Sequence, residues 1–344
     1  MIDLVSIRET KMRRIKRIVF AAAGIFLFAE GAAAAENIVL ATASTGGSYY
    51  PVGVALSTAV TNDLAEFYDI RMSPITWGGS AENVDLIRLG EAQMAIMMGL
   101  YGRDGYTASG TRAGRPAVTN LRSIAALWQN VEQFVVRKDK IKSGTLADLG
   151  DLGTQFSIGP RNSGTEGTSR LVLGAVGIEP EKAFSVTNMK YDAAAEALQN
   201  GRIDGMSASA GVPTPSVAQA FVTSGDEIAL LNVSDEQLEA ISKGSGGLFT
   251  RAEIKAGTYE NQGETVQTIR QPNFLAVSAG LSEETVYLIT KAMFENLHKL
   301  QQANQAARAI SMDDALQGLP VPLHPGAIRY YKDVGIDVPT HLLP

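Results

Sequence analysis

The chain has 344 residues, of which 45% are hydrophobic, a formal net charge of −6 at pH 7, and no cysteine. This length is enough for two hydrophobic cores, so we expect two lobes. The acidic balance argues against nucleic acid as a partner, and the lack of cysteine excludes disulfides, thiolate metal sites and a lipid-modified cysteine.

The first 35 residues have the pattern of a secretory signal. Basic residues at 11–17 precede an apolar run at 18–29, and Ala33, Ala34 and Ala35 supply a small-residue cleavage site. The apolar run has about a dozen residues, whereas a membrane-spanning helix needs about 20. We expect cleavage after the last of these alanines, with translation starting at the first or the second methionine.

Export would change the charge of the chain. The signal segment contains six Lys or Arg and three Asp or Glu residues, so the mature chain would have a formal charge of −9. With no cysteine available for lipidation, we expect this mature chain to be free in the periplasm.

Short strand-like runs alternate with longer stretches of helical periodicity. The strand-like runs include residues 38–40, 94–97, 134–136 and 156–158, and helices are expected after Pro51, Ser80, Ser163 and Asp192. This order predicts an α/β fold with mostly parallel sheets.

The C-terminal third has a different pattern. Residues 244–272 combine glycines with polar residues, and we expect irregular structure there. A strand at 274–277 and one long helix from Ser282 to about residue 307 should follow. Prolines in the remaining tail argue against further regular helix.

Three loops place glycine and hydroxyl residues at the start of a predicted helix. They are residues 44–51, 77–83 and 162–166. Helix N-termini have free N–H groups and a partial positive charge, so they hold a carboxylate or another oxyanion without a cationic side chain. Any one loop is also ordinary helix capping. The three together predict a small anion site.

The sequence offers little for catalysis. The histidines, His298, His324 and His341, all lie in the C-terminal quarter and lack metal-site spacing. No Lys-Ser/Thr pair follows the glycines, which argues against a nucleotide phosphate loop. We therefore expect no enzymatic activity, no cofactor and no metal ion.

The chain resembles the TAXI-type solute receptors of tripartite ATP-independent periplasmic (TRAP) transporters over nearly all of its mature length. The resemblance rests on residues 45–51, 79–83, 89–92, 121–127, 163–166, 201–204 and 210–215. It implies a two-lobed periplasmic binding protein fold, type II-like, with mostly parallel sheets and two crossover hinge strands, here near residues 133–136 and 273–275. Lobe one would be residues 36–131 with 271–344, and lobe two residues 132–270.

The resemblance also implies a function. A TAXI receptor captures a small carboxylate or amino-acid-like ligand between its lobes and delivers it to a TRAP-type membrane permease. A periplasmic sensor that reports to a signalling partner is the alternative. We expect the ligand to contact Thr45, Gly46, Gly47, Tyr49, Tyr50, Trp77, Gly79, Ser80, Asn83, Ser163, Gly164, Thr165 and Gly211.

Some positions depart from the family pattern. Residues 98–100 are Met-Gly-Leu where relatives commonly have a polar run, and residues 205–209 are small where relatives often have bulky aromatics. Trp77 stands where a smaller residue is common. These differences argue against glutamate and favour a larger or more apolar carboxylate. Whether the three aromatic residues of the loops belong to the core or wall a pocket stays open.

Overall fold

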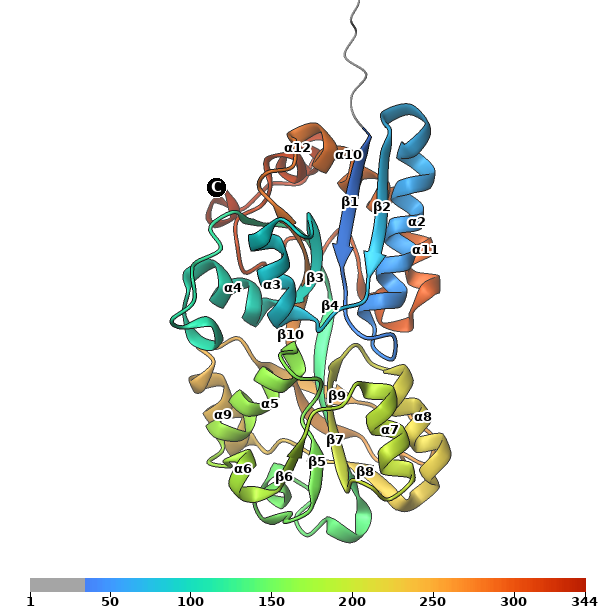
Figure 1. Cartoon of the computed structure of the whole chain (residues 1–344), viewed down its shortest axis with the longest axis vertical. Helices are drawn as coiled ribbons and strands as arrows, with labels where there is room; N and C mark the ends of the chain where they lie inside the picture. The colour runs from blue at the N-terminus through green and yellow to red at the C-terminus, as the bar shows by residue number, and fades with distance from the viewer. Residues whose placement is uncertain (1–34) are drawn as a thin grey trace, which may run out of the picture. The chain divides into compact units, whose positions relative to one another are not determined.

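Strands and helices alternate along most of the chain in the computed structural model, which describes residues 35–344 (Figure 1). The predicted secretory signal lies outside these residues, apart from its last alanine. Among the described residues, no helix has both the length and the apolar character needed to cross a bilayer.

The first lobe contains both ends of the described chain. Its elements are β1 (Glu36–Ala41), α2 (Tyr49–Tyr68), β2 (Ile70–Ile75), α3 (Ser80–Leu89), β3 (Met94–Met98), α4 (Gly99–Thr107), α10 (Glu283–Glu295), α11 (Leu297–Ala303) and α12 (Pro325–Asp333). β1 pairs in parallel with β2 on one side and with β3 on the other. This is the parallel arrangement that the alternation of strands and helices predicts.

The second lobe repeats the arrangement with shorter strands. It contains β5 (Gln155–Ser157), α5 (Gly164–Ala175), α6 (Pro180–Ala183), β6 (Ser185–Thr187), α7 (Tyr191–Gln199), β7 (Gly205–Ala210), α8 (Pro215–Ser224), β8 (Ile228–Leu230), α9 (Asp235–Gly244) and β9 (Thr250–Ile254). β5 pairs in parallel with both β6 and β7.

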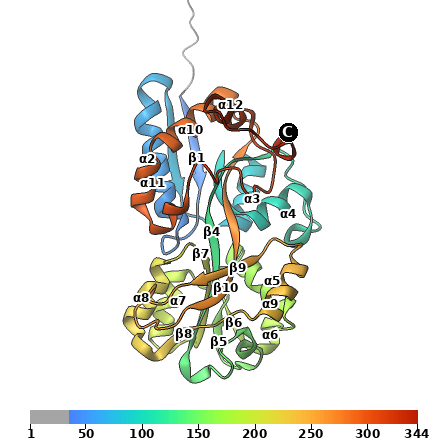
Figure 2. The ribbon, with the colours of Figure 1, turned by 180° about the vertical axis from the view of Figure 1, so that it is seen from behind.

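Two long strands, β4 (Leu121–Arg137) and β10 (Val266–Ser278), run through both lobes and pair with each other in antiparallel fashion (Figures 1 and 2). The strand order is β2-β1-β3-β10-β4-β7-β5-β6, with β8 on β4 and β9 on β10. Every antiparallel ladder involves β4 or β10. The predicted α/β fold with two crossover strands is confirmed, and the predicted crossing segments lie within these two strands.

The lobes have separate hydrophobic cores. One hydrophobic cluster fills the first lobe, and Trp128 is the last residue of β4 that belongs to it. Two further clusters cover the two faces of the second-lobe sheet and begin on β4 at Val131. On β10 the change of core falls between Ile269 and Phe274. The crossing segments therefore separate the cores and connect them directly.

Three predictions for the C-terminal third are wrong. Residues 325–333 of the tail form the helix α12, because Pro325 stands at its first position, where a proline is tolerated. Residues 250–254 and 266–278 are strands that pair as β9 and β10, because their buried and exposed side chains alternate despite the glycines around them. The single helix expected after Ser282 is interrupted at Asn296, whose side chain donates to Ala292 O at 2.8 Å and to Asp63 Oδ2 at 2.5 Å. The chain continues there as α11.

Candidate functional site

The N-termini of α2, α3 and α5 meet at one cavity between the lobes. It has a volume of about 30 Å³ and is lined by Ala43, Ser44, Gly47, Ser48, Tyr49, Gly78, Gly79, Ser80, Met98, Pro160, Ser163, Gly164, Thr165, Tyr191, Ser209 and Ala210. None of these lining residues is charged. The polar groups at the cavity are hydroxyls and backbone atoms.

The three helix starts differ in how their first amides are satisfied. At α5 the Ser163 hydroxyl accepts a hydrogen bond from Glu166 N–H at 3.1 Å. At α2 and α3 the capping positions are Ser48 and Gly79, and no side chain within residues 35–344 caps these helices. The first-turn N–H groups of a helix have no acceptor in their own helix and carry a partial positive charge. An oxyanion in the cavity would supply that acceptor.

Two buried tyrosine hydroxyls line the cavity from opposite lobes. Tyr49 on α2 donates to Asn273 Oδ1 at 2.5 Å. Tyr191 on α7 shares a hydrogen bond with Thr165 Oγ1 and contacts the backbone N–H and C=O of Ser209. Burial raises the pKa of both tyrosines, which keeps both hydroxyls neutral. Both hydroxyls therefore line the cavity without adding a charge to it.

The lobes approach each other closely at Gly164, the first residue of α5. A Cβ added there would lie 3.0 Å from both Ser80 Cβ and Met98 Cε of the first lobe. Ser80 is itself held in place, because its hydroxyl accepts a hydrogen bond from Met98 N–H at 3.0 Å. The small cavity and this close approach together describe a closed arrangement of the lobes.

The structure brings seven of the residues predicted from the loops to the cavity. They are Gly47, Tyr49, Gly79, Ser80, Ser163, Gly164 and Thr165. They come from all three loops, so the convergence expected of the three helix starts is present in the fold.

Thr45 and Gly46 connect the lobes instead of lining the cavity. Thr45 Oγ1 donates to Asp192 Oδ2 at 3.3 Å, and Ser216 N–H donates to Gly46 O at 3.4 Å. A Cβ at Gly46 would collide with the Asp192 carboxylate. These two residues therefore act at the lobe interface.

Asn83 and Gly211 also lie outside the cavity. Asn83 is buried, and its Nδ2 donates to Thr42 O and Ile96 O, both at 3.0 Å, which ties α3 to the ends of β1 and β3. A Cβ at Gly211 would lie 2.8 Å from the Trp128 ring, so glycine allows β7 to approach the first lobe. Both residues position backbone near the site.

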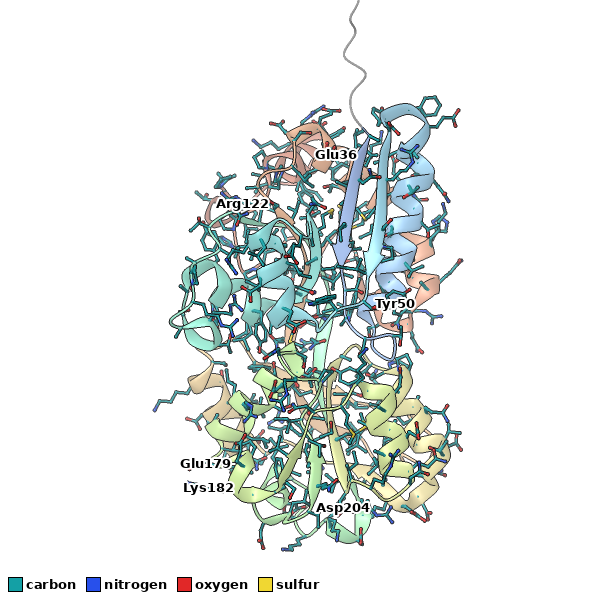
Figure 3. The ribbon with its side chains drawn as sticks, viewed as in Figure 1. Glu36, Tyr50, Arg122, Glu179, Lys182 and Asp204 are labelled. Carbon is teal, nitrogen blue, oxygen red and sulfur yellow. The ribbon has the colours of Figure 1, made fainter. Side chains whose placement is uncertain are left out.

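The two remaining predicted aromatics lie farther out. Tyr50 is half-buried at the start of α2 (Figure 3). Trp77 is 53% exposed and lines an open groove of about 520 Å³, which shares Ser44, Gly78 and Pro160 with the cavity. Trp77 therefore belongs neither to the core nor to the cavity wall.

Sequence reasoning missed nine lining residues, namely Ala43, Ser44, Ser48, Gly78, Met98, Pro160, Tyr191, Ser209 and Ala210. Five of these lie in or beside the predicted loops. Tyr191 and Ser209 come from elements without a glycine-rich start, and the only available signal was the run of small, buried residues in β7. That run predicted a roomy site. The cavity is instead small, because Tyr49, Tyr191 and Met98 occupy its surroundings.

A buried acid that the sequence analysis did not single out lies directly behind this lining. Glu132 on β4 is 1% exposed and accepts a hydrogen bond from the Ser209 hydroxyl. Burial raises its pKa to about 8, an effect that the side chains of Ser209 and Gln271 only partly offset. At neutral pH this carboxyl is therefore mostly protonated.

Among residues 35–344, no three His, Asp or Glu side chains are grouped to hold a metal ion. His324 is buried, and its Nδ1 accepts a hydrogen bond from Gly326 N–H at 3.2 Å at the start of α12. Burial lowers its pKa. This histidine therefore has a structural role as a helix cap.

An α/β chain with two cores, two crossing strands and a cavity between the lobes has the architecture of a two-lobed periplasmic binding protein. The NMT1-like family matches residues 40–335, and the chain belongs to this family.

Solved structures that are similar to this chain include the following two. The periplasmic aliphatic sulphonate binding protein SsuA from Escherichia coli is 12% identical, with a TM-score of 0.42 over 87% of this chain and 83% of that chain. MatC from Rhodopseudomonas palustris, solved with bound malate, is 12% identical, with a TM-score of 0.48 over 79% of this chain and 88% of that chain.

Proposed function

We propose that the protein is a solute-binding receptor that captures a small carboxylate in the cavity between its lobes. The observation that carries the proposal is the meeting of three helix N-termini at a cavity with uncharged walls. Helix amides bind oxyanions through charge-assisted hydrogen bonds and the helix dipole. The seven predicted residues at the cavity, together with Ser44, Ser48, Tyr191 and Ser209, would form the site.

The size of the cavity limits the ligand. A volume of about 30 Å³ is far below the several hundred Å³ of pockets that hold drug-sized molecules. We propose a compact acid, with its carboxylate at the helix starts and an apolar part against Met98. Such a ligand would contact both lobes, and we propose that the lobes separate before it enters.

Lobe movement is part of the proposal. We assign residues 36–131 with 271–344 to lobe one and residues 132–270 to lobe two, joined by β4 and β10. The change of hydrophobic core between Trp128 and Val131 falls within three residues of the first boundary, and Val131 itself packs in the second-lobe core. Rotation about the two crossing strands would open the cavity, as in hinge closure around a ligand.

The cellular role follows from the resemblance and from the N-terminal pattern. We propose that a cleavable signal at residues 1–35 directs the chain to the periplasm. There it would act as a TAXI-type receptor and hand its ligand to a TRAP-type membrane permease. The receptor would catalyse no reaction and would need no cofactor.

A thermal-shift screen tests the ligand class. Pyruvate, succinate and L-glutamate are compared with the neutral analogues pyruvamide and succinamide on the mature chain. An acid at 100 times its dissociation constant should stabilise the protein by about 2.7 kcal/mol. The neutral analogues should have no effect, since they lack the anionic oxygens that the helix amides favour. Stabilisation by the amides but not by the acids would overturn the anion site.

A further inference from the structure

Glu132 is a buried carboxyl one hydrogen bond behind the cavity. It pairs with Ser209 across the β4–β7 ladder, and the Ser209 hydroxyl, which belongs to the cavity lining, donates to its Oε2. The other oxygen, Oε1, is buried and has no hydrogen-bond partner within residues 35–344. An ionised carboxylate with an open oxygen is costly in such a place.

The groups around Glu132 are uncharged at neutral pH. Three tyrosines on three helices interact with it electrostatically, namely Tyr49 on α2, Tyr101 on α4 and Tyr191 on α7. Burial raises the pKa of all three, so each remains neutral. Gln271 on β10 is an uncharged neighbour as well.

No cation compensates the carboxyl. Glu132 takes part in no ion pair with a lysine, arginine or histidine in the part of the chain that the structure describes. Burial without a cation favours the neutral acid, and its pKa of about 8 agrees with this geometry. A proton on Glu132 removes the negative charge from the back of the cavity.

We propose that Glu132 makes anion binding depend on a proton: the cavity accepts a carboxylate while Glu132 is neutral and loses affinity for it once Glu132 ionises. This inference rests on the proposed function, because it assumes an anion in the cavity. The protonated Glu132 can donate its proton to Ser209 Oγ, which leaves the Ser209 hydroxyl proton for a ligand oxygen about 5 Å from the Glu132 carboxyl. At an effective dielectric constant of about 20, repulsion between two charges at that distance weakens binding by about a hundredfold.

The opposite role for Glu132 makes a different prediction. An ionised Glu132 would attract a ligand ammonium group, and removal of its charge would then abolish binding of an amino acid. The open Oε1 and the absence of a cation near Glu132 in the described chain favour the neutral acid instead.

The test measures binding of succinate and pyruvate by titration calorimetry at pH 7 and pH 9. Wild type is compared with Glu132→Gln, which keeps the shape of the neutral acid, and with Glu239→Gln on the exposed side of α9 as a control. Both probes stay fully ionised over this range. Wild type and the control should lose about tenfold in affinity between the two pH values, whereas Glu132→Gln should keep its affinity.

Infrared difference spectra check the proton directly. The carboxylic acid band of wild type at pH 7 should be absent in Glu132→Gln and present in Glu239→Gln. Loss of L-glutamate binding in Glu132→Gln at pH 7, or the same pH dependence in wild type and Glu132→Gln, would overturn the coupling alone. Failure of succinate, pyruvate and L-glutamate to bind wild type at either pH would overturn the proposed function and the coupling together.

Discussion

Among the spaces between the lobes, the smallest has the best chemistry for a ligand. The cavity at the helix starts has a volume of about 30 Å³ and no charged lining residue. The groove beside it, between α3 and α5, measures about 430 Å³ and is lined by six charged residues, namely Glu82, Asp85, Arg112, Arg115, Glu166 and Arg170. Volume and charge alone would favour the groove.

Five of the six charged residues of the groove are paired with each other, and the sixth, Glu82, accepts a hydrogen bond from Gly78 N–H at 3.1 Å. Arg112 holds Asp85 with two hydrogen bonds, at 2.6 and 2.9 Å, and Arg115 reaches the same carboxylate at 3.2 Å. Arg170 lies 3.3 Å from Glu166. A ligand there would have to displace existing partners, whereas the cavity presents helix amides that have none in their own helix. Unpaired polar groups, and not a larger volume, indicate the site.

The largest expected effect is on the pH dependence of stability, in which the buried Glu132 should differ from an ordinary, exposed glutamate. Glu132 has a pKa of about 8 when folded, above its ordinary value, so its contribution to stability is complete in acid and is lost as the pH rises towards 8. Relative to Glu132→Gln, wild type should lose about 4 kcal/mol of unfolding free energy between pH 5 and pH 9. Urea titrations at both pH values measure this difference. A constant difference would mean that Glu132 is already ionised at pH 5.

The second prediction places a charge at the start of α5, where Gly164 lies close to the other lobe. Gly164→Asp adds a carboxylate at the start of α5, where repulsion of a bound anion is about 3 kcal/mol, or about a hundredfold in affinity. The added Cβ also presses on Ser80 and Met98. Calorimetric titration with the tightest-binding acid of the screen measures the loss.

Two variants separate these effects. Gly164→Ala adds only the steric contact, so it should weaken binding by about tenfold or less. Gly174→Asp puts the same charge near the other end of α5, where an added Cβ meets no atom within 4 Å, and binding should not change. Unchanged affinity in folded Gly164→Asp would remove the start of α5 from the site.

Local patterns in the sequence predicted the parts of the fold and the site that depend on neighbours in the chain. Glycine and serine before an apolar helical repeat are enough to locate the starts of α2, α3 and α5. The sequence pattern did not predict the β9–β10 pairing, because this pairing joins residues 250–254 to 266–270 across a polar, glycine-containing loop. Such a pairing depends on tertiary contacts that periodicity does not contain.

The part of the site that the sequence did not predict also depends on tertiary contacts. Glu132 meets Ser209 only through the register between β4 and β7, which joins positions 77 residues apart. In the sequence, Glu132 is one acid among 36 acidic residues. Its burial and its missing cation are visible only once the strands are paired.

The third prediction tests the paired charges of the groove. Burial would raise the pKa of Asp85, but hydrogen bonds and charge from Arg112 and Arg88 outweigh it and hold this pKa below its usual value. The stability it contributes is therefore present at neutral pH and lost in acid, the opposite sign to Glu132. Asp85→Asn leaves the buried Arg112 without its carboxylate partner and should cost about 2 kcal/mol at pH 7.

The loss of stability in Asp85→Asn should not be accompanied by a loss of ligand affinity. Asp85→Asn should bind the tightest acid of the screen within about twofold of wild type, because the groove supplies no ligand contact. Asp151→Asn, at a carboxylate that is 94% exposed, should change neither stability nor binding. A large loss of affinity in Asp85→Asn would move the site into the groove.

The smallest expected effect concerns the one helix start at the cavity that has a side-chain cap. Ser163→Ala removes the hydroxyl that accepts from Glu166 N–H, which should cost about 1 kcal/mol of unfolding free energy. Ser234→Ala is the matched control, because Ser234 caps α9 in the same way, accepting from Gln237 N–H at 3.2 Å, and is not part of the cavity lining.

If the backbone amides at the start of α5 hold the anion, the two variants should lose similar stability in urea titrations. Ser163→Ala should also keep its affinity for the tightest-binding acid within about threefold. A hundredfold loss in Ser163→Ala, with Ser234→Ala unchanged, would instead show that the hydroxyl itself contacts the ligand. In that case the Ser163 hydroxyl would contact the ligand as well as cap α5. The presence of a side-chain cap at α5, and its absence at α2 and α3, would then no longer show which helix starts bind the ligand through backbone amides alone.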